Sequence, residues 1–259
     1  MSSAATVIIP SSPDEAAQAF AADPGVTVIG GGTVVVPRNS LGWMPVERAL
    51  WLGKAGLDSI DESGGQVTIG GTASLASCAG LAAPVGACIA NIGDNELRAQ
   101  ATVGGNICLD LPFGDLRGPL LALDATVRSV GADGETSTPA ASFFADHDGR
   151  LVLDVSYDAP AAGSFVPLTR HHTVTLTGMA ISAARSASGD VRVAATGAAP
   201  DARRLSAVEA ALASGASAAD AASEASQHAE PFDDVLASAA YRSRVLPVLV
   251  RRAIEALGA

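Results

Sequence analysis

The chain has 259 residues, 48% of them hydrophobic and 17% charged, which is enough apolar material for one large domain or two smaller ones. Its formal net charge of −11 argues against a nucleic-acid partner, because an acidic surface repels a phosphate backbone. Residues 1–15 lack a basic segment and contain Pro10 and Pro13, so we expect no secretory signal and a cytoplasmic protein.

The N-terminal part alternates predicted strands with a helix. Strands are expected at residues 6–9 and 26–29, and a helix at 15–22, where Ser11 or Ser12 can cap it and Pro13 can occupy its first turn. The glycine run Gly30 to Gly32 follows the second strand, and the β-branched residues 34–36 predict that the chain leaves this turn extended. This order predicts a small α/β unit.

The middle of the chain has a mixed pattern. Strands are predicted at residues 66–70, 125–130 and 151–157, and helices at 75–83 and 119–124. Residues 72–93 carry no charge, which raises the alternative of a membrane span. Their small side chains and the central Pro84 favour two short buried segments instead.

The C-terminal part predicts three strands followed by helices. The strands are expected at residues 165–168, 174–184 and 191–196. Residues 207–229 are rich in alanine and predict helix with a break at Gly215, and 241–257 predict a longer helix. Its arginines, Arg242, Arg244, Arg251 and Arg252, are expected on a solvated face.

The first chemically informative motif is the run Gly30-Gly31-Gly32-Thr33 directly after a strand. Glycines let the backbone approach a ligand closely and present N–H groups to an anion. The run matches neither the dinucleotide fingerprint G-x-G-x-x-G nor the P-loop. Taken alone, it is also compatible with a tight structural turn.

A second glycine motif, Thr102-Val103-Gly104-Gly105-Asn106, lies later in the chain. Two glycines between Thr and Asn offer backbone donors and two short polar side chains at one bend. Such a set can hold a pyrophosphate or the edge of a flavin ring, and two such loops in one chain favour ligand binding over two structural turns.

Other reactive residue types form no recognisable site. Cys78, Cys88 and Cys108 include no CxxC pair, so we expect no iron–sulfur cluster on this chain. His171 and His172 are adjacent on a predicted strand and would point to opposite faces, so we expect no shared metal ion. No catalytic triad or carboxylate pair is apparent, which suits a protein whose chemistry belongs to a cofactor.

Several motifs in the same order together resemble one family. The Gly30–Thr33 loop, the segment from Arg98 to Asn106, and the segment from Asp115 to Ala125 (D-x-x-x-x-L-L-A-L-D-A) look like the flavoprotein subunit of carbon monoxide dehydrogenase and the FAD domain of xanthine dehydrogenase. Further along, G-A-A-P with Arg203, A-S-x-x-Y-R at 237–242 and V-L-V-R-R-A at 248–253 resemble the C-terminal part of that family. The resemblance therefore covers nearly the whole chain.

The resemblance implies an α+β fold. We expect a two-subdomain PCMH-type FAD-binding domain, followed by a small C-terminal α+β domain with a three-stranded antiparallel sheet and helices. The expected boundaries are residues 1–56 and 57–163 for the two FAD-binding subdomains and 164–259 for the C-terminal domain.

The resemblance also implies the residues that contact FAD. Backbone amides of the first loop would wrap the pyrophosphate, an apolar side chain would cover a ring, and the second motif and an acidic residue would bind polar parts of the cofactor. The implied residues are Ile29, Gly30, Gly31, Gly32, Thr33, Val34, Ile92, Thr102, Gly105, Asn106 and Asp115.

Three positions depart from the family pattern. Val34 replaces a polar or acidic residue, Ala99 replaces an asparagine, and Pro167 stands where many relatives have a lysine. The last departure puts NAD⁺ in doubt as electron acceptor more than it affects FAD binding.

The implied function is electron transfer within a molybdenum hydroxylase. This chain would bind FAD, take electrons from a small subunit with two [2Fe–2S] clusters, and pass them to an acceptor such as a quinone, O₂ or NAD⁺. A large subunit with a molybdopterin cofactor would oxidise the substrate, in a dimer of heterotrimers. Two alternatives stay open: a free-standing flavin oxidoreductase of this fold, and a non-catalytic scaffold that has lost FAD.

Overall fold

The computed structural model describes residues 6–109, 115–170 and 176–258. The chain divides into two compact units, each made of segments that are discontinuous in sequence. Unit 1 comprises Met1–Ser77, Asn95–Cys108 and Thr126–Ser156, and unit 2 comprises Cys78–Asp94, Leu109–Ala125 and Tyr157–Ala259. The three-part division at residues 56 and 163 stays a prediction.

Unit 1 contains a three-stranded parallel sheet with the order β1-β3-β2. Its strands are β1 (Thr6–Ile8), β3 (Arg48–Trp51) and β2 (Thr27–Ile29). Helix α1 (Pro13–Ala22) connects β1 to β2 and is capped as predicted, because the Ser12 hydroxyl accepts the Glu15 N–H at 3.2 Å. The predicted α/β unit is confirmed.

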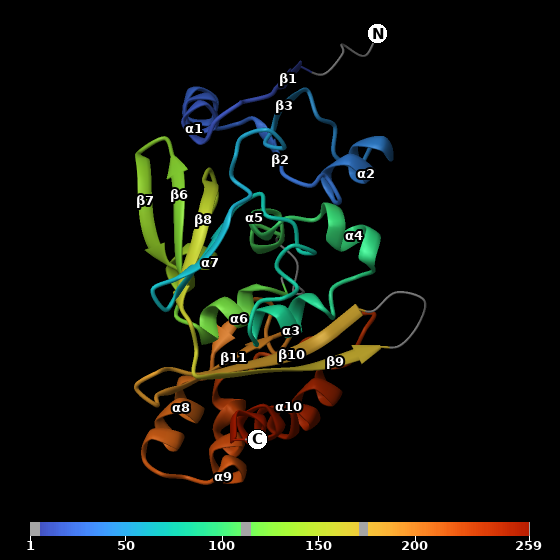
Figure 1. Ribbon diagram of the computed structural model, residues 1–259. Helices are drawn as coiled ribbons and strands as arrows, with labels where there is room; N and C mark the ends of the chain where they lie inside the picture. The colour runs from blue at the N-terminus through green and yellow to red at the C-terminus, as the bar shows by residue number, and fades with distance from the viewer. Residues whose placement is uncertain (1–5, 110–114, 171–175, 259) are drawn as a thin grey trace. The chain divides into compact units, whose positions relative to one another are not determined.

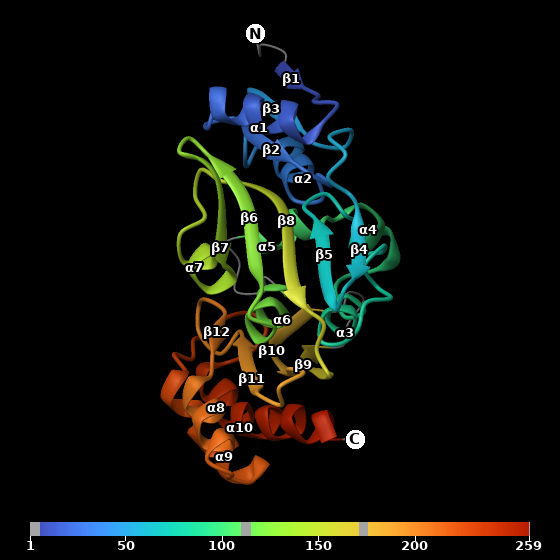
Figure 2. The same cartoon turned by 60° about the vertical axis from the view of Figure 1, so that its left-hand side comes forward.

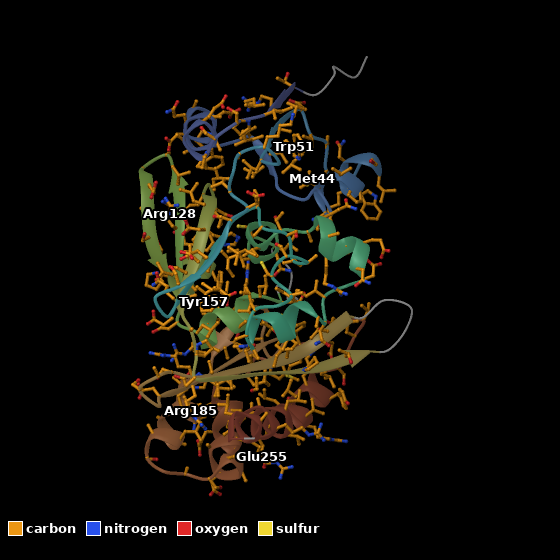
Figure 3. The ribbon with its side chains drawn as sticks, in the orientation of Figure 1. Met44, Trp51, Arg128, Tyr157, Arg185 and Glu255 are labelled. Atoms are coloured by element: carbon orange, nitrogen blue, oxygen red, sulfur yellow. The ribbon has the colours of Figure 1, made fainter. Side chains whose placement is uncertain are left out.

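A five-stranded sheet of order β4-β5-β8-β6-β7 forms the rest of unit 1 (Figure 2). Its strands and accompanying helices are β4 (Ile60–Ser63), β5 (Gln66–Gly70), β8 (Leu151–Asp158), β6 (Thr126–Gly131), β7 (Gly134–Pro139), α4 (Asn95–Gln100), α5 (Val103–Ile107) and α7 (Ala140–Ala145). Arg128 lies on β6 (Figure 3). It pairs with Asp154 of β8 and, at 2.9 Å, with Glu135 of β7. One apolar cluster joins both sheets, and it includes Phe20, Leu50 and Leu151.

Unit 2 is built on a four-stranded antiparallel sheet with the order β12-β11-β10-β9. Its strands are β9 (Ala162–Arg170), β10 (Leu176–Arg185), β11 (Val191–Thr196) and β12 (Arg203–Arg204). The three predicted strands are present. The two-residue strand β12 is an addition, and it is too short to leave a sequence pattern.

Helices lie on both faces of this sheet (Figure 1). One face is covered by α3 (Val85–Ile89) and α6 (Arg117–Ala122). The other is covered by α8 (Ser206–Ala213), α9 (Ala218–Ser223), the 3₁₀ helix η1 (Glu224–His228), α10 (Ala239–Glu255) and the 3₁₀ helix η2 (Ala256–Gly258). Gly215 separates α8 from α9 with φ of 88°, as the sequence predicts.

The prediction of a helix at residues 75–83 is wrong. The Leu75 N–H donates to the Ala101 carbonyl at 2.8 Å and the Ala76 N–H to the Arg98 carbonyl at 2.9 Å, so this segment pairs with distant backbone instead. A helix forms only after the proline, at Val85–Ile89. Among the helices of the described residues, none combines the length and the apolarity that a membrane span requires.

The solvated position predicted for Arg242 is also wrong, because its side chain is 1% exposed. The guanidinium donates to the carbonyls of Gly178, Gly197 and Phe232, and it pairs with Asp234 at 2.7 Å. The carbonyls come from distant parts of unit 2, so helical spacing could not identify them. The other three arginines of α10 are exposed as predicted.

Candidate functional site

The first glycine loop connects β2 to the helix α2 (Val35–Ser40). The prediction that the chain is extended after this loop is therefore wrong. Gly32 has φ of 72°, and its carbonyl accepts the Val36 N–H at 2.9 Å, which starts a helical turn. The strand preference of β-branched residues is too weak to prevent this, and Pro37 is tolerated because it lies in the first turn.

The backbone N–H groups of this loop are the distinctive feature of the site. In the described part of the chain, the N–H groups of residues 30–34 donate no hydrogen bond. The same residues are partly buried. Consecutive, partly buried N–H groups that have no protein partner are available to an anion or to ordered water.

The second glycine motif uses its donors within the protein. The Thr102 hydroxyl accepts the Gly105 N–H at 3.2 Å and caps α5. The N–H groups of Val103 and Gly104 donate to carbonyls in the segment after β5, those of Ala73 at 3.0 Å and Gly71 at 2.8 Å. The backbone donors that the sequence suggested for a ligand therefore hold α5 in place.

The two glycine motifs lie against each other in unit 1. A Cβ atom on Gly31 would lie 1.8 Å from the Gln100 carbonyl oxygen, and one on Gly30 would lie 2.6 Å from the Thr102 hydroxyl oxygen. Only glycine allows this approach. The structural and the ligand-binding interpretations of the first loop are therefore compatible, since one side of the loop packs on residues 100–102.

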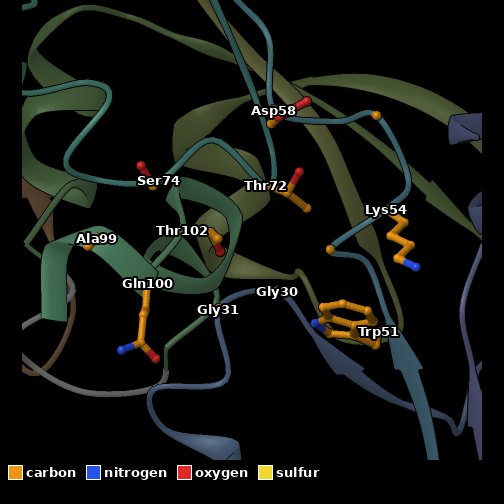
Figure 4. Close-up of a pocket in the computed structure, with 12 residues that line it drawn as sticks. Gly30, Gly31, Trp51, Lys54, Asp58, Thr72, Ser74, Ala99, Gln100 and Thr102 are labelled. Atoms are coloured by element: carbon orange, nitrogen blue, oxygen red, sulfur yellow. The ribbon is translucent and has the colours of Figure 1, made fainter. Parts of the chain in front are cut away.

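A cavity of about 520 Å³ opens beside Gly30 and Gly31 (Figure 4). Its remaining lining residues are Trp51, Gly53, Lys54, Gly56, Asp58, Thr72, Ser74, Ala99, Gln100 and Thr102. Trp51 and Lys54 lie on one side in this view, and Ala99, Gln100 and Thr102 on the other. The lining combines glycine backbone, hydroxyl groups, one aromatic ring, one cation and the Asp58 carboxylate. The ring, the cation and the glycine backbone fit an anionic ligand with a flat ring, whereas Asp58 opposes the anion.

Three lining residues at the end of β3 and between β3 and β4 were not predicted from the sequence. Trp51, Lys54 and Asp58 belong to no glycine motif, yet they line the same cavity as Gly30. One signal was present: Lys54 is the only lysine in the sequence.

Two predicted site residues, Ile92 and Asp115, belong to unit 2. Ile92 is 7% exposed. Burial raises the pKa of the Asp115 carboxyl to about 7, against a smaller opposing effect of its own backbone N–H. Burial and the nearby Asp115 also raise the pKa of the Cys88 thiol. Asp115 can thus carry a proton near neutral pH.

The remaining predicted positions have definite places. Ile29 ends β2, Thr33 lies in the first loop, and Val34 directly precedes α2. Asn106 lies in α5 and is 7% exposed, whereas Pro167 lies in β9, opposite Ala180 of β10. His171 and His172 lie outside the described residues.

Comparison with known protein families decides the assignment. Residues 3–156 match the family described as the FAD-binding domain in molybdopterin dehydrogenase. The chain belongs to this family. Residues 170–257 match the C-terminal domain of the carbon monoxide dehydrogenase flavoprotein, so both parts of the predicted fold are confirmed. As a member of the FAD-binding family, the protein is an oxidoreductase component.

Solved structures have the same fold as this family member. Carbon monoxide dehydrogenase from Hydrogenophaga pseudoflava, in a form lacking the Mo-pyranopterin moiety of the molybdenum cofactor, matches with a TM-score of 0.86 and 22% identity, over 100% of this chain and 98% of that chain. Reconstituted CO dehydrogenase from Oligotropha carboxidovorans matches with a TM-score of 0.87 and 21% identity, over 99% and 98%. Quinoline 2-oxidoreductase from Pseudomonas putida 86 matches with a TM-score of 0.84 and 20% identity, over 98% of this chain and 97% of that chain. A search of curated proteins found no match.

Proposed function

We propose that this chain is the FAD-binding, electron-transferring subunit of a cytoplasmic molybdenum hydroxylase. The observation that carries the proposal is the run of backbone N–H groups at residues 30–34, which donate no hydrogen bond within the described chain. Membership of the FAD-binding family supports the identity of the ligand. These donors fit a pyrophosphate, because an anion can accept several of them at once.

The residues of the first loop have distinct parts in this proposal. The amides from Gly30 to Val34 hold the pyrophosphate, next to the end of β2 at Ile29. Thr102, Gly105 and Asn106 contribute at the second motif, where the Thr102 hydroxyl keeps α5 and the neighbouring first loop in place. These contacts bind and orient the cofactor without supplying an acid or base.

Ile92 and Asp115 are the proposed FAD contacts outside the two glycine motifs. Ile92 covers a ring with its apolar side chain. Asp115 binds a polar part of FAD and, with its raised pKa, can donate a hydrogen bond from a protonated carboxyl near neutral pH. When bound, FAD supplies the redox chemistry.

The partners in this proposal are a large molybdopterin subunit and a small subunit with two [2Fe–2S] clusters, arranged as a dimer of heterotrimers. Electrons would arrive from the [2Fe–2S] subunit and leave to an external acceptor. Co-expression of the chain with candidate partners, followed by measurement of the complex mass, tests this part. Substrate-dependent bleaching of the flavin in the isolated chain would instead favour the free-standing oxidoreductase.

FAD binding is tested on the isolated chain. We expect the purified protein to take up FAD and to show flavin absorbance at about 450 nm. Asn106→Ala and Asp115→Ala are expected to weaken FAD binding at least tenfold, or by about 1.4 kcal/mol. Asp148→Ala removes an exposed carboxyl of unit 1 and serves as the control. Wild-type protein that takes up no flavin would refute the proposal.

A further inference from the structure

Lys54 is an unusual cation in this chain. It is the only lysine, in a protein with a formal net charge of −11. It follows β3 in the segment that leads towards β4, and it lines the cavity beside Gly30 and Gly31 (Figure 4). The only ammonium side chain of the protein is therefore located beside the glycine loop.

Lys54 differs from three arginines of unit 1 in its partners. Arg48 pairs with Asp23 at 2.6 Å, Arg128 with Glu135 at 2.9 Å, and Arg150 with Asp133 at 2.9 Å. Lys54 forms no ion pair with any residue that the structure describes. Its charge is thus available to an anion that enters the cavity, as are the N–H groups of the loop.

The indole of Trp51 is held next to this cation by a glycine. A Cβ atom on Gly53 would lie 2.4 Å from the Trp51 ring, so the ring occupies the space that a side chain at residue 53 would need. Trp51 is partly buried and lines the cavity. An aromatic wall, a cation and free amides together fit a nucleotide, whose base is flat and whose phosphates are anionic.

We infer that Lys54 binds the pyrophosphate of FAD in the cavity beside Gly30 and Gly31, and that Trp51 forms the wall against which the adenine packs. This inference rests on the proposed FAD binding and adds residues outside both glycine motifs. Asp58 lines the same cavity, and its carboxylate opposes an anion there. The inference therefore predicts opposite effects for the two charged residues.

The first experiment measures FAD affinity by quenching of flavin fluorescence. Lys54→Met is expected to raise the Kd about fivefold, or about 1 kcal/mol, because Lys54 is exposed and its ion pair with phosphate is partly screened. Lys54→Arg keeps the charge and should restore most of the affinity. Asp58→Asn should lower the Kd. Arg244→Met removes an exposed cation of α10 and serves as the matched control.

Ligand fragments separate the two parts of the inference. ADP contains the adenine and the pyrophosphate, whereas riboflavin contains neither. Lys54→Met and Trp51→Ala should both weaken ADP binding and leave riboflavin binding unchanged. An equal loss for riboflavin would overturn the inference, because it would indicate general damage to the site.

The second experiment uses the single lysine directly. An amine-reactive acetylating reagent should modify Lys54 in the apoprotein, and mass spectrometry of the peptide containing Lys54 gives the rate. FAD or ADP should slow this modification at least fivefold, and riboflavin should not.

Failure of the inference and failure of the proposed function are distinguishable. If the wild-type chain binds FAD, but Lys54→Met has an unchanged Kd and FAD does not protect Lys54, the inference alone is overturned. If the wild-type chain takes up no FAD, the proposed function itself is refuted.

Discussion

Replacing Gly31 by alanine tests the contact between the first glycine loop and the residues directly before the second motif. The added Cβ would lie 1.8 Å from the Gln100 carbonyl oxygen, whereas real Cβ atoms essentially never approach another atom closer than 3.0 Å. The two backbones must therefore separate by about 1.2 Å, the difference between these two distances. The nearest atoms are backbone atoms of Gln100 and Ala101, and no flexible side chain among them could move aside.

The expected cost follows from this overlap. Overpacking typically destabilises a protein by about 1–3 kcal/mol, and we expect Gly31→Ala to lie at about 3 kcal/mol because backbone has to move. This corresponds to a melting temperature about 6–12 °C lower for a chain of this size. FAD binding should also weaken at least tenfold, because the amides at residues 30–34 move with the loop.

The assay compares thermal melting and FAD titration of Gly31→Ala with those of Gly25→Ala. Gly25 lies in the same unit, and a Cβ there would be 3.6 Å from its nearest neighbour, an ordinary contact. Gly25→Ala should change stability by less than about 1 kcal/mol. If Gly31→Ala melts like Gly25→Ala and binds FAD like the wild type, the close approach of the loop to Gln100 is refuted.

Three other substitutions have defined outcomes. Arg242→Met leaves buried carbonyls and Asp234 without their cation, so urea unfolding should show a loss of about 3–5 kcal/mol, against less than about 0.5 kcal/mol for the exposed Arg244→Met. Thr102→Val removes the cap of α5 and should lower the free energy of unfolding by about 1 kcal/mol. Thr102→Ser keeps the capping hydroxyl and should retain most of this stability. The raised pKa of Asp115, about 7 against 3.8, means that the folded apoprotein holds this proton more tightly than the unfolded chain, so stability falls as pH rises from 4 to 7. Asp115→Asn should remove this loss, and its advantage over wild type should grow to at most about 4 kcal/mol at pH 8; a pH-independent difference would contradict the assignment.

Local signals predicted much of the fold. The cap at Ser12 and the place of Pro13 in the first turn of α1 were predicted, although the helix begins at Pro13 and not at Glu15. The strands β5, β6, β8 and the three longer strands of unit 2 were also predicted. Two errors, the helix at residues 75–83 and the exposed position of Arg242, occurred where distant backbone decides the structure. Leu75 pairs with Ala101, so a segment of good helical composition forms turns instead.

The candidate site was predictable only in part. Both glycine motifs were recognisable, but their hydrogen bonds were not, because those depend on segments far away in sequence. Trp51, Lys54 and Asp58 reach the cavity through the connection from β3 to β4, which carries no motif. Arg242 shows the same limit, since its carbonyl partners come from separate segments of unit 2.

The two glycine motifs differ in a way that composition alone cannot express. The amides of Val103, Gly104 and Gly105 are bonded inside unit 1, whereas those at residues 30–34 donate no bond to any described residue. The second motif therefore acts on the first by packing, since a Cβ atom on Gly30 would lie 2.6 Å from the Thr102 hydroxyl oxygen and only glycine fits there. If the first loop binds the pyrophosphate as proposed, substitutions in the second motif should weaken FAD through the position of that loop. Double substitutions across the contact should then be non-additive, as expected for residues that act through one shared backbone position.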